Sequence, residues 1–179
     1  VWRRDIAWFI DKYVHWATYT PEEQAVMIAY ASVYGDTENA ANILASRLAD
    51  LGVRNIAMYD VSVTHSSYIV SEAFRCSHIV LASTTYNAGI FINMENALND
   101  IVAHNLQNRT FALIENGTWA PTAGELMRAQ LSKLKNTTIL DTPVRVMSSV
   151  KDAGVEQLNA LAQAIVDSMH VESESEAPA

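Results

Sequence analysis

Residues 25–59 read AVMIAYA-SVYGDTE-NAANILASRLADLGVR-NIAMY, and their pattern predicts the class of fold. Its first seven residues, 25–31, are a continuous apolar run, which is typical of a strand buried on both faces of a parallel sheet. A polar loop leads into a helical pattern over about 37–50, which Gly52 ends. Residues 55–59 predict a second strand. A strand, a helix and a strand in this order predict a parallel β-α-β unit.

The same alternation continues along the chain. Further strands are expected at 78–82, 110–114 and 137–147, the last broken or bent near Pro143. Helices are expected near 66–75, 92–104 and 123–134, and a last helix carries one apolar stripe from Leu158 to Met169. Five strands alternating with helices predict an α/β fold with a parallel sheet covered on both faces. Ligands bind such sheets outside the carboxyl ends of the strands, where the strand order reverses.

The two ends of the chain differ from this pattern. Residues 1–18 predict an amphipathic helix, because apolar residues recur at helical spacing from Ile6 to Ala17. We therefore divide the chain into an arm at 1–23, a domain at 24–170 and an acidic, disordered tail at 171–179. The first residue is Val rather than Met, which suggests a fragment or a processed chain.

Composition excludes several classes of function. The 179 residues include 12 Lys and Arg against 20 Asp and Glu, a net charge of −8, which argues against nucleic acid and anionic membranes as partners. No apolar run is long enough to span a membrane, no secretory signal is visible, and Cys76 is the only cysteine. These features favour a cytoplasmic protein.

Metal and catalytic residues are not expected. The five histidines lack metal-ligand spacing, so each is interpreted as a surface or structural residue: His15, His65, His78, His104 and His170. Glu38 and Glu115 are interpreted as a first-turn helix carboxylate and a loop hydrogen-bonding group, rather than as general bases.

The loop after the first strand, Ser32-Val33-Tyr34-Gly35-Asp36-Thr37, offers hydroxyls, a glycine and backbone amides at a helix N-terminus. Such a loop suits a phosphate group, although it contains no Lys or Arg. The P-loop ending GK[ST] and the dinucleotide fingerprint G-x-G-x-x-G are both absent. The alternative is an ordinary N-cap, formed by Asp36 or Ser32.

Two further loops follow the third and fourth strands. They are Ser83-Thr84-Thr85-Tyr86-Asn87-Ala88-Gly89 and Glu115-Asn116-Gly117-Thr118-Trp119-Ala120-Pro121. Each places one aromatic residue, Tyr86 or Trp119, among turn-forming residues, so the pair could sandwich a flat ring system. The alternative is that both rings pack on neighbouring helices. Because all three loops end at one sheet edge, we expect a single site.

These three loops together resemble those of the flavodoxin-like FMN-binding fold. More closely, the chain resembles the C-terminal flavodoxin domain of flavodiiron proteins, in which an N-terminal metallo-β-lactamase-like domain carries two irons. Val1-Trp2-Arg3 resembles the junction between those domains, and the helix behind it resembles the connector. The resemblance covers about residues 1–170.

The resemblance implies a three-layer sandwich with a five-stranded parallel sheet in the order 2-1-3-4-5. It also implies FMN as cofactor, with the phosphate on residues 32–37 and the ring and ribityl chain along 83–89. Residues 115–119 would then cover the other side. Ser32 and Tyr34 stand where free flavodoxins have Thr, and Asp36 places a carboxylate near the phosphate.

The role implied by the resemblance is electron transfer. The donor would be a reduced protein such as rubredoxin or an NADH-linked reductase, and the acceptor a diiron site that reduces O2 or NO. Residues 1–23 would connect to a missing upstream diiron domain, and the family's head-to-tail arrangement implies a homodimer. The alternatives are a free-standing flavodoxin-like shuttle, an NAD(P)H-quinone reductase of the same fold, and a partner-binding module with an empty site.

Overall fold

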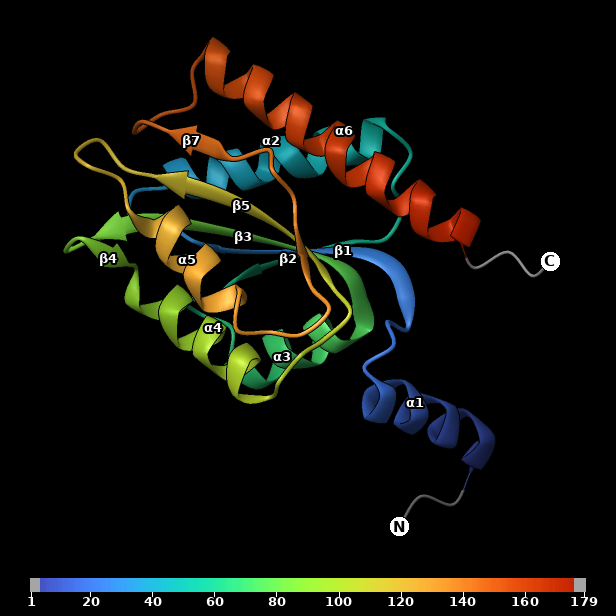
Figure 1. The fold of residues 1–179 in the computed structure, drawn as a ribbon. Coiled ribbons are helices and arrows are strands. Elements are labelled where there is room, and N and C mark those ends of the chain that lie inside the picture. Colours follow the sequence, from blue (N-terminus) through green and yellow to red (C-terminus); the bar gives the residue numbers. More distant parts are fainter. Residues whose placement is uncertain (1–3, 176–179) are drawn as a thin grey trace.

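The computed structural model describes residues 4–175, and Figure 1 shows helices on both faces of a sheet, with α1 set to one side. The helices are α1 (Ile6–Thr18), α2 (Asp36–Asp50), α3 (Ser66–Arg75), α4 (Ile92–Ala103), α5 (Ala123–Leu131) and α6 (Asp152–Ser175). The strands are β1 (Glu23–Ala31), β2 (Ile56–Asp60), β3 (Cys76–Tyr86), β4 (Gly89–Ile90), β5 (Thr110–Asn116), β6 (Thr138–Ile139) and β7 (Val144–Val146). Val1-Trp2-Arg3 and the tail residues 176–179 lie outside the described residues.

The order of the sheet confirms the predicted flavodoxin-like fold. The strands run β2-β1-β3-β5-β6, which is the expected order 2-1-3-4-5. The fifth position holds two short strands, since β6 pairs with the start of β5 and β7 with its end, and Pro143 lies between them. Strand β4 is not part of this parallel order and pairs antiparallel with the end of β3. The sheet therefore has seven strands rather than five.

Two strands continue at their carboxyl ends into segments that were predicted as loops. Residues 83–86, expected in a loop, continue β3, and residues 115–116 likewise continue β5. The two extensions pair with each other, Ser83 opposite Glu115 and Thr84 opposite Asn116. Thr85 and Tyr86 then pair with β4. Thr and Tyr favour strands, and partners from distant parts of the sequence supply the hydrogen bonds that a loop would lack.

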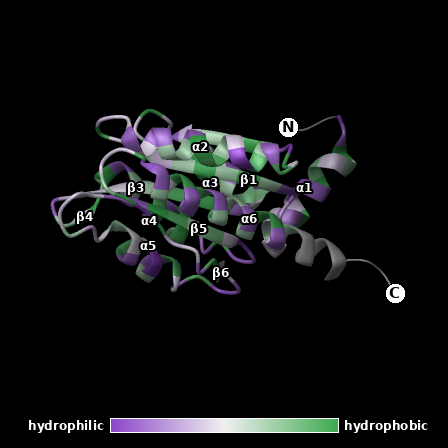
Figure 2. Cartoon of the chain, turned by 90° about the horizontal axis from the view of Figure 1, so that it is seen from above, coloured by the Kyte–Doolittle hydropathy of each residue, from purple (hydrophilic) through white to green (hydrophobic). Residues whose placement is uncertain are grey.

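The core has two halves because neighbouring strand residues point to opposite faces of the sheet. Met27 and Ala29 of β1 join a cluster with α3, α4 and α5, whereas Val26 and Ile28 join a cluster with α2 and α6. Figure 1 shows these two sets of helices on opposite faces, and Figure 2 shows hydrophobic residues along the central strands between them. This burial on both faces explains the continuous apolar run that opens the domain.

Helix α1 has no buried residue and is attached at its C-terminal end. Glu22 forms an ion pair with Lys12 and accepts a hydrogen bond from Trp16 Nε1 at 2.6 Å. The buried Arg109 guanidinium donates to the carbonyl oxygens of Tyr19, at 2.7 Å, and Phe74, at 2.6 Å. A buried guanidinium needs such acceptors, so Arg109 links the end of α1 to the end of α3.

Helix α6 confirms the predicted apolar stripe, whose residues Leu158, Leu161 and Ile165 are buried against the sheet. Its backbone stays helical to Ser175, past the predicted boundary at residue 171. Within residues 4–175, none of the helices is both long enough and apolar enough to cross a membrane.

His78 is a buried structural histidine, as predicted, and its ring bridges two hydroxyl groups. Ser168 Oγ donates to the carbonyl of Ile165, so it accepts from His78 Nε2–H at 3.0 Å. His78 Nδ1 then accepts from Ser77 Oγ at 2.8 Å. Burial disfavours the charged ring and lowers the pKa of His78 from 6.5 to about 4.

This lowered pKa predicts acid sensitivity. Below pH 6.5 the unfolded chain binds a proton at His78, whereas the folded chain does not bind it until the pH approaches about 4. The free energy of unfolding therefore falls as the pH drops from 6.5 toward about 4. The full effect is about 3 kcal/mol. Chemical denaturation at several pH values should show a steeper loss for the wild type than for His78→Gln. Parallel curves for the two proteins would contradict this account.

A strained turn joins β3 to β4. Its two central residues, Asn87 and Ala88, have φ of 50° and 57°, which is the left-handed pair that a type I′ hairpin turn requires. Asn tolerates this region, but Ala does not favour it, and glycine is the usual second residue. Ala88 therefore carries local strain.

Replacing Ala88 with Gly should raise the free energy of unfolding by about 0.5–1 kcal/mol, because relief of the strain outweighs the greater freedom of glycine in the unfolded chain. The same change at the exposed helical residue Ala129 is the matched control and should lower stability by about 1 kcal/mol. Urea denaturation measures both. Equal destabilisation by the two changes would show that the turn is not strained.

Candidate functional site

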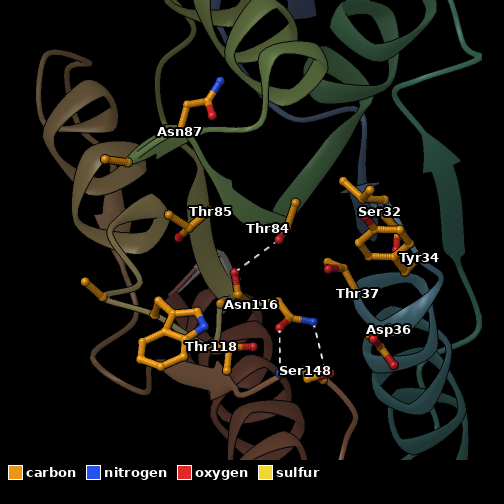
Figure 3. Close-up of a pocket in the computed structure, with 15 residues that line it drawn as sticks. Ser32, Tyr34, Asp36, Thr37, Thr84, Thr85, Asn87, Asn116, Thr118 and Ser148 are labelled. Carbon is orange, nitrogen blue, oxygen red and sulfur yellow. Dashed lines mark hydrogen bonds between the residues drawn. The ribbon is translucent and has the colours of Figure 1, made fainter.

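A pocket of about 370 Å³ lies at the carboxyl ends of β1, β3, β5 and β7. Its size falls within the range of small-molecule sites. It is lined by Ser32, Val33, Tyr34, Asp36, Thr37, Thr84, Thr85, Asn87, Ala88, Asn116, Gly117, Thr118, Trp119, Ala120 and Ser148. Residues of all three predicted loops therefore surround one cavity, and Figure 3 shows them arranged around it.

The first wall is the turn between β1 and α2. Ser32 Oγ accepts a hydrogen bond from the amide of Gly35 at 3.0 Å, which fixes the turn and leaves the hydroxyl proton free to donate. Gly35 has a φ of 93°, a backbone conformation that glycine adopts readily and residues with a Cβ rarely adopt. Gly35 is also the N-cap of α2. Neither Ser32 nor Asp36 caps the helix with its side chain.

Because the N-cap is a glycine, the first-turn amides of α2 are left for a ligand. The side chain of Thr37, in this turn, is almost fully buried and belongs to the pocket lining. The lining holds one charged residue, Asp36, and no Lys or Arg. An anion here would bind through hydroxyl groups, amides and the positive end of the helix.

The second wall is the β3–β4 hairpin. Thr84 Oγ1 donates to the carbonyl of Asn116 at 3.3 Å, which joins the ends of β3 and β5. Thr85 Oγ1 accepts from the amides of Thr122, at 3.0 Å, and Ala123, at 3.1 Å, at the start of α5. Both threonines thus tie the hairpin to the third wall.

The third wall follows β5 and is fixed by a paired hydrogen bond. Asn116 donates from Nδ2 to the Ser148 carbonyl at 3.0 Å, and its Oδ1 accepts from the Ser148 amide at 3.1 Å. The loop between Asn116 and α5 presents Trp119, whose side chain is 89% exposed. A large apolar ring so little covered is available to contact a ligand or another surface.

Five predicted site residues do not line the pocket: Gly35, Ser83, Tyr86, Gly89 and Glu115. Gly35 shapes the first turn, Ser83 is buried within β3, and Gly89 pairs with Tyr86 in the hairpin. The ring of Tyr86 meets Phe91 edge-on, with 5.8 Å between centroids. The aromatic residues of the pocket are instead Tyr34, which is 93% exposed, and Trp119.

Glu115 supports the third wall from behind. Its carboxylate accepts from the Gly124 amide at 2.9 Å and from Arg145 Nε at 2.6 Å. An added Cβ at Gly124 would stand 2.9 Å from Glu115 Oε2, so a larger residue there would displace the carboxylate. As predicted, Glu115 is a hydrogen-bonding group, and it joins β5 to β7 and to α5.

Ala120 and Ser148 also line the pocket. Ala120 lies in the predicted third loop but outside the residues 115–119 assigned to the ligand, and Ser148 was not predicted. Ser148 follows β7, the last parallel strand, so the rule that carboxyl ends meet at one edge would have found it. Among residues 4–175, no group of three His, Cys, Asp or Glu side chains gathers as a metal site does.

Comparison with family models finds no match. Among curated proteins, the rubredoxin-oxygen oxidoreductase of Megalodesulfovibrio gigas is 28% identical over 87% of this chain. The anaerobic nitric oxide reductase flavorubredoxin of Aeromonas hydrophila is 26% identical over 91% of it. The chain spans only 38% and 31% of the lengths of these two relatives.

Solved structures agree. The rubredoxin oxygen:oxidoreductase from Desulfovibrio gigas superposes with a TM-score of 0.85 and 26% identity, over 93% of this chain and 41% of that one. A flavodoxin from the domain Archaea has a TM-score of 0.70 and 17% identity, and the match covers 82% of this chain and 99% of the flavodoxin. The second likeness shows the fold. By sequence and by fold, this chain is therefore a relative of the flavodiiron proteins and corresponds to the flavodoxin-like part of their length.

Proposed function

We propose that this chain binds FMN and relays electrons from a reduced donor to the diiron site of a flavodiiron O2 or NO reductase. The observation that carries the proposal is the convergence of three loops on one pocket whose first wall is built from hydroxyl groups and open helix amides. Bound FMN supplies the redox chemistry, and the protein supplies binding, orientation and electrostatics.

The residues of the pocket fit such a ligand. Ser32, Thr37 and the first-turn amides of α2 would hold the phosphate, because all of them donate hydrogen bonds at one helix N-terminus. Polar groups of the second and third walls would meet the ribityl chain and the polar edge of the ring. Trp119 and Tyr34 offer exposed aromatic surface for the ring itself.

The wider setting belongs to the same proposal. The two relatives are named for rubredoxin, oxygen and nitric oxide, which supports rubredoxin as the proposed donor. An NADH-linked reductase is the alternative donor within the same proposal. Helix α1, with no buried residue of its own, is the proposed connector to a diiron domain. A homodimer would bring one chain's flavin pocket toward its partner's irons.

A flavin titration tests the site. The purified chain should quench the fluorescence of added FMN, and its melting temperature should rise with FMN concentration. Ser32→Ala with Thr37→Val should weaken FMN by at least tenfold, because each hydrogen bond to a charged group contributes roughly 1.5–3 kcal/mol. Ser132→Ala, an exposed hydroxyl outside the pocket, is the control. Unchanged FMN affinity in the double variant would overturn the assignment of the loop.

Electron transfer needs its own experiment. Reduced rubredoxin, mixed anaerobically with the FMN-loaded chain, should bleach the visible flavin absorption, whereas NADH alone should leave it unchanged. Rapid bleaching by NADH alone would instead favour an NAD(P)H-quinone reductase of the same fold. No bleaching by reduced rubredoxin, nor by NADH together with an NADH-linked reductase, would contradict the proposed relay.

A further inference from the structure

Asp36 is the one charged residue that lines the pocket. It opens α2, its side chain is half-buried, and Figure 3 shows it beside Thr37 on the wall assigned to the phosphate. Among the residues that the structure describes, none forms a hydrogen bond or an ion pair with its carboxylate. Its negative charge therefore lies at the pocket margin without a neutralising partner.

The helix N-terminus is the main positive feature of this wall. Its partial charge of about +0.5 favours an anion, but it already stabilises the carboxylate of Asp36. A phosphate bound at this wall would share the positive end of the helix with Asp36. No Lys or Arg in the pocket lining offsets the repulsion between the phosphate and the Asp36 carboxylate. The carboxylate therefore opposes the phosphate while leaving the uncharged ring and ribityl chain unaffected.

We propose that Asp36 is the specificity-determining residue that lowers the preference of this pocket for a phosphorylated flavin over an unphosphorylated one. The inference rests on the proposed FMN function. It concerns the phosphomonoester alone, because riboflavin carries the same ring and ribityl chain without the charge.

Glu38 provides an internal comparison. It is the second carboxylate in the first turn of α2, but it does not line the pocket. Its Oε1 accepts a hydrogen bond from the Tyr30 hydroxyl at 3.3 Å. Burial, and then the charge of Glu38, raise the pKa of Tyr30, so this hydroxyl stays protonated and continues to donate. Two acidic residues of one helical turn thus differ in whether they face the ligand.

The test compares FMN and riboflavin affinities in the wild type, Asp36→Asn and Glu38→Gln. Asp36→Asn should tighten FMN roughly fivefold, the factor for one pair of unit charges a few ångströms apart in water. Riboflavin affinity should stay unchanged. Glu38→Gln should alter the ratio of the two affinities by less than twofold. The gain for FMN should shrink as salt rises from about 0.02 M to 0.5 M, because ions screen the repulsion.

The melting temperature without flavin supplies a second readout. Asp36→Asn should lower it slightly, since the carboxylate stabilises the helix end. If Asp36→Asn lowers the melting temperature and also tightens FMN binding, the cause is the loss of charge repulsion, because a less ordered pocket would bind FMN more weakly. Asp36→Ser repeats the test if the Asn variant folds poorly. An unchanged affinity ratio in a chain that binds FMN would overturn this inference alone. Weaker binding of both flavins would also overturn it, because Asp36 would then be a ligand for the ribityl chain. No FMN binding by the wild type would instead overturn the proposed function.

Discussion

The paired hydrogen bond between the Asn116 side chain and the Ser148 backbone is the interaction on which the pocket depends. Asn116 ends β5, and Ser148 follows β7, so this bond continues the pairing of the two strands beyond Val146. The Asn116 carbonyl also accepts from Thr84 at the end of β3. One residue thereby joins three strand ends, and the loop that carries Trp119 starts from a fixed point.

The hydrogen-bonded walls of the pocket differ from its aromatic side chains, which are exposed. The bonds of Thr85 and Glu115 hold the start of α5 in place, whereas Tyr34 and Trp119 project almost fully into solvent. A rigid polar frame with exposed aromatic residues suits a ligand that is flat, large and partly polar. The same frame leaves the phosphate wall without a cation, so hydroxyl groups, amides and the helix dipole must act together there.

Much of the fold was predictable because each apolar run is short and is bounded by turn-forming residues, which favours a strand over a helix. A run buried on both faces predicts a parallel strand, and the order of strands and helices then limits the topology. The split of the fifth strand was visible at Pro143, which cannot donate to a ladder. Strand ends were harder, because Ser83–Tyr86 become a strand only through partners that are distant in sequence.

The location of the site at the carboxyl edge of the sheet was predictable, but the side chains that line it were less so. The rule for carboxyl ends located the three loops, but it did not say which side of the hairpin Tyr86 would take. That choice follows from the two-residue turn at Asn87 and Ala88, which sets the register of β4 and turns Tyr86 toward Phe91. Ser148 follows a strand that Pro143 interrupts, so the apolar pattern over 137–147 does not mark the carboxyl end of that strand.

The most direct test of the proposed flavin pocket is an amide NMR titration with FMN and, separately, with riboflavin. We expect FMN to shift the amides of Gly35, Asp36 and Thr37 strongly, whereas riboflavin should leave them nearly unchanged. Amides of residues 84–88 and 116–120 should respond to both flavins. If FMN instead shifts residues elsewhere, such as those around Trp16, Phe74 and His104 between α1, α3 and α4, the pocket at the sheet edge is not the flavin site.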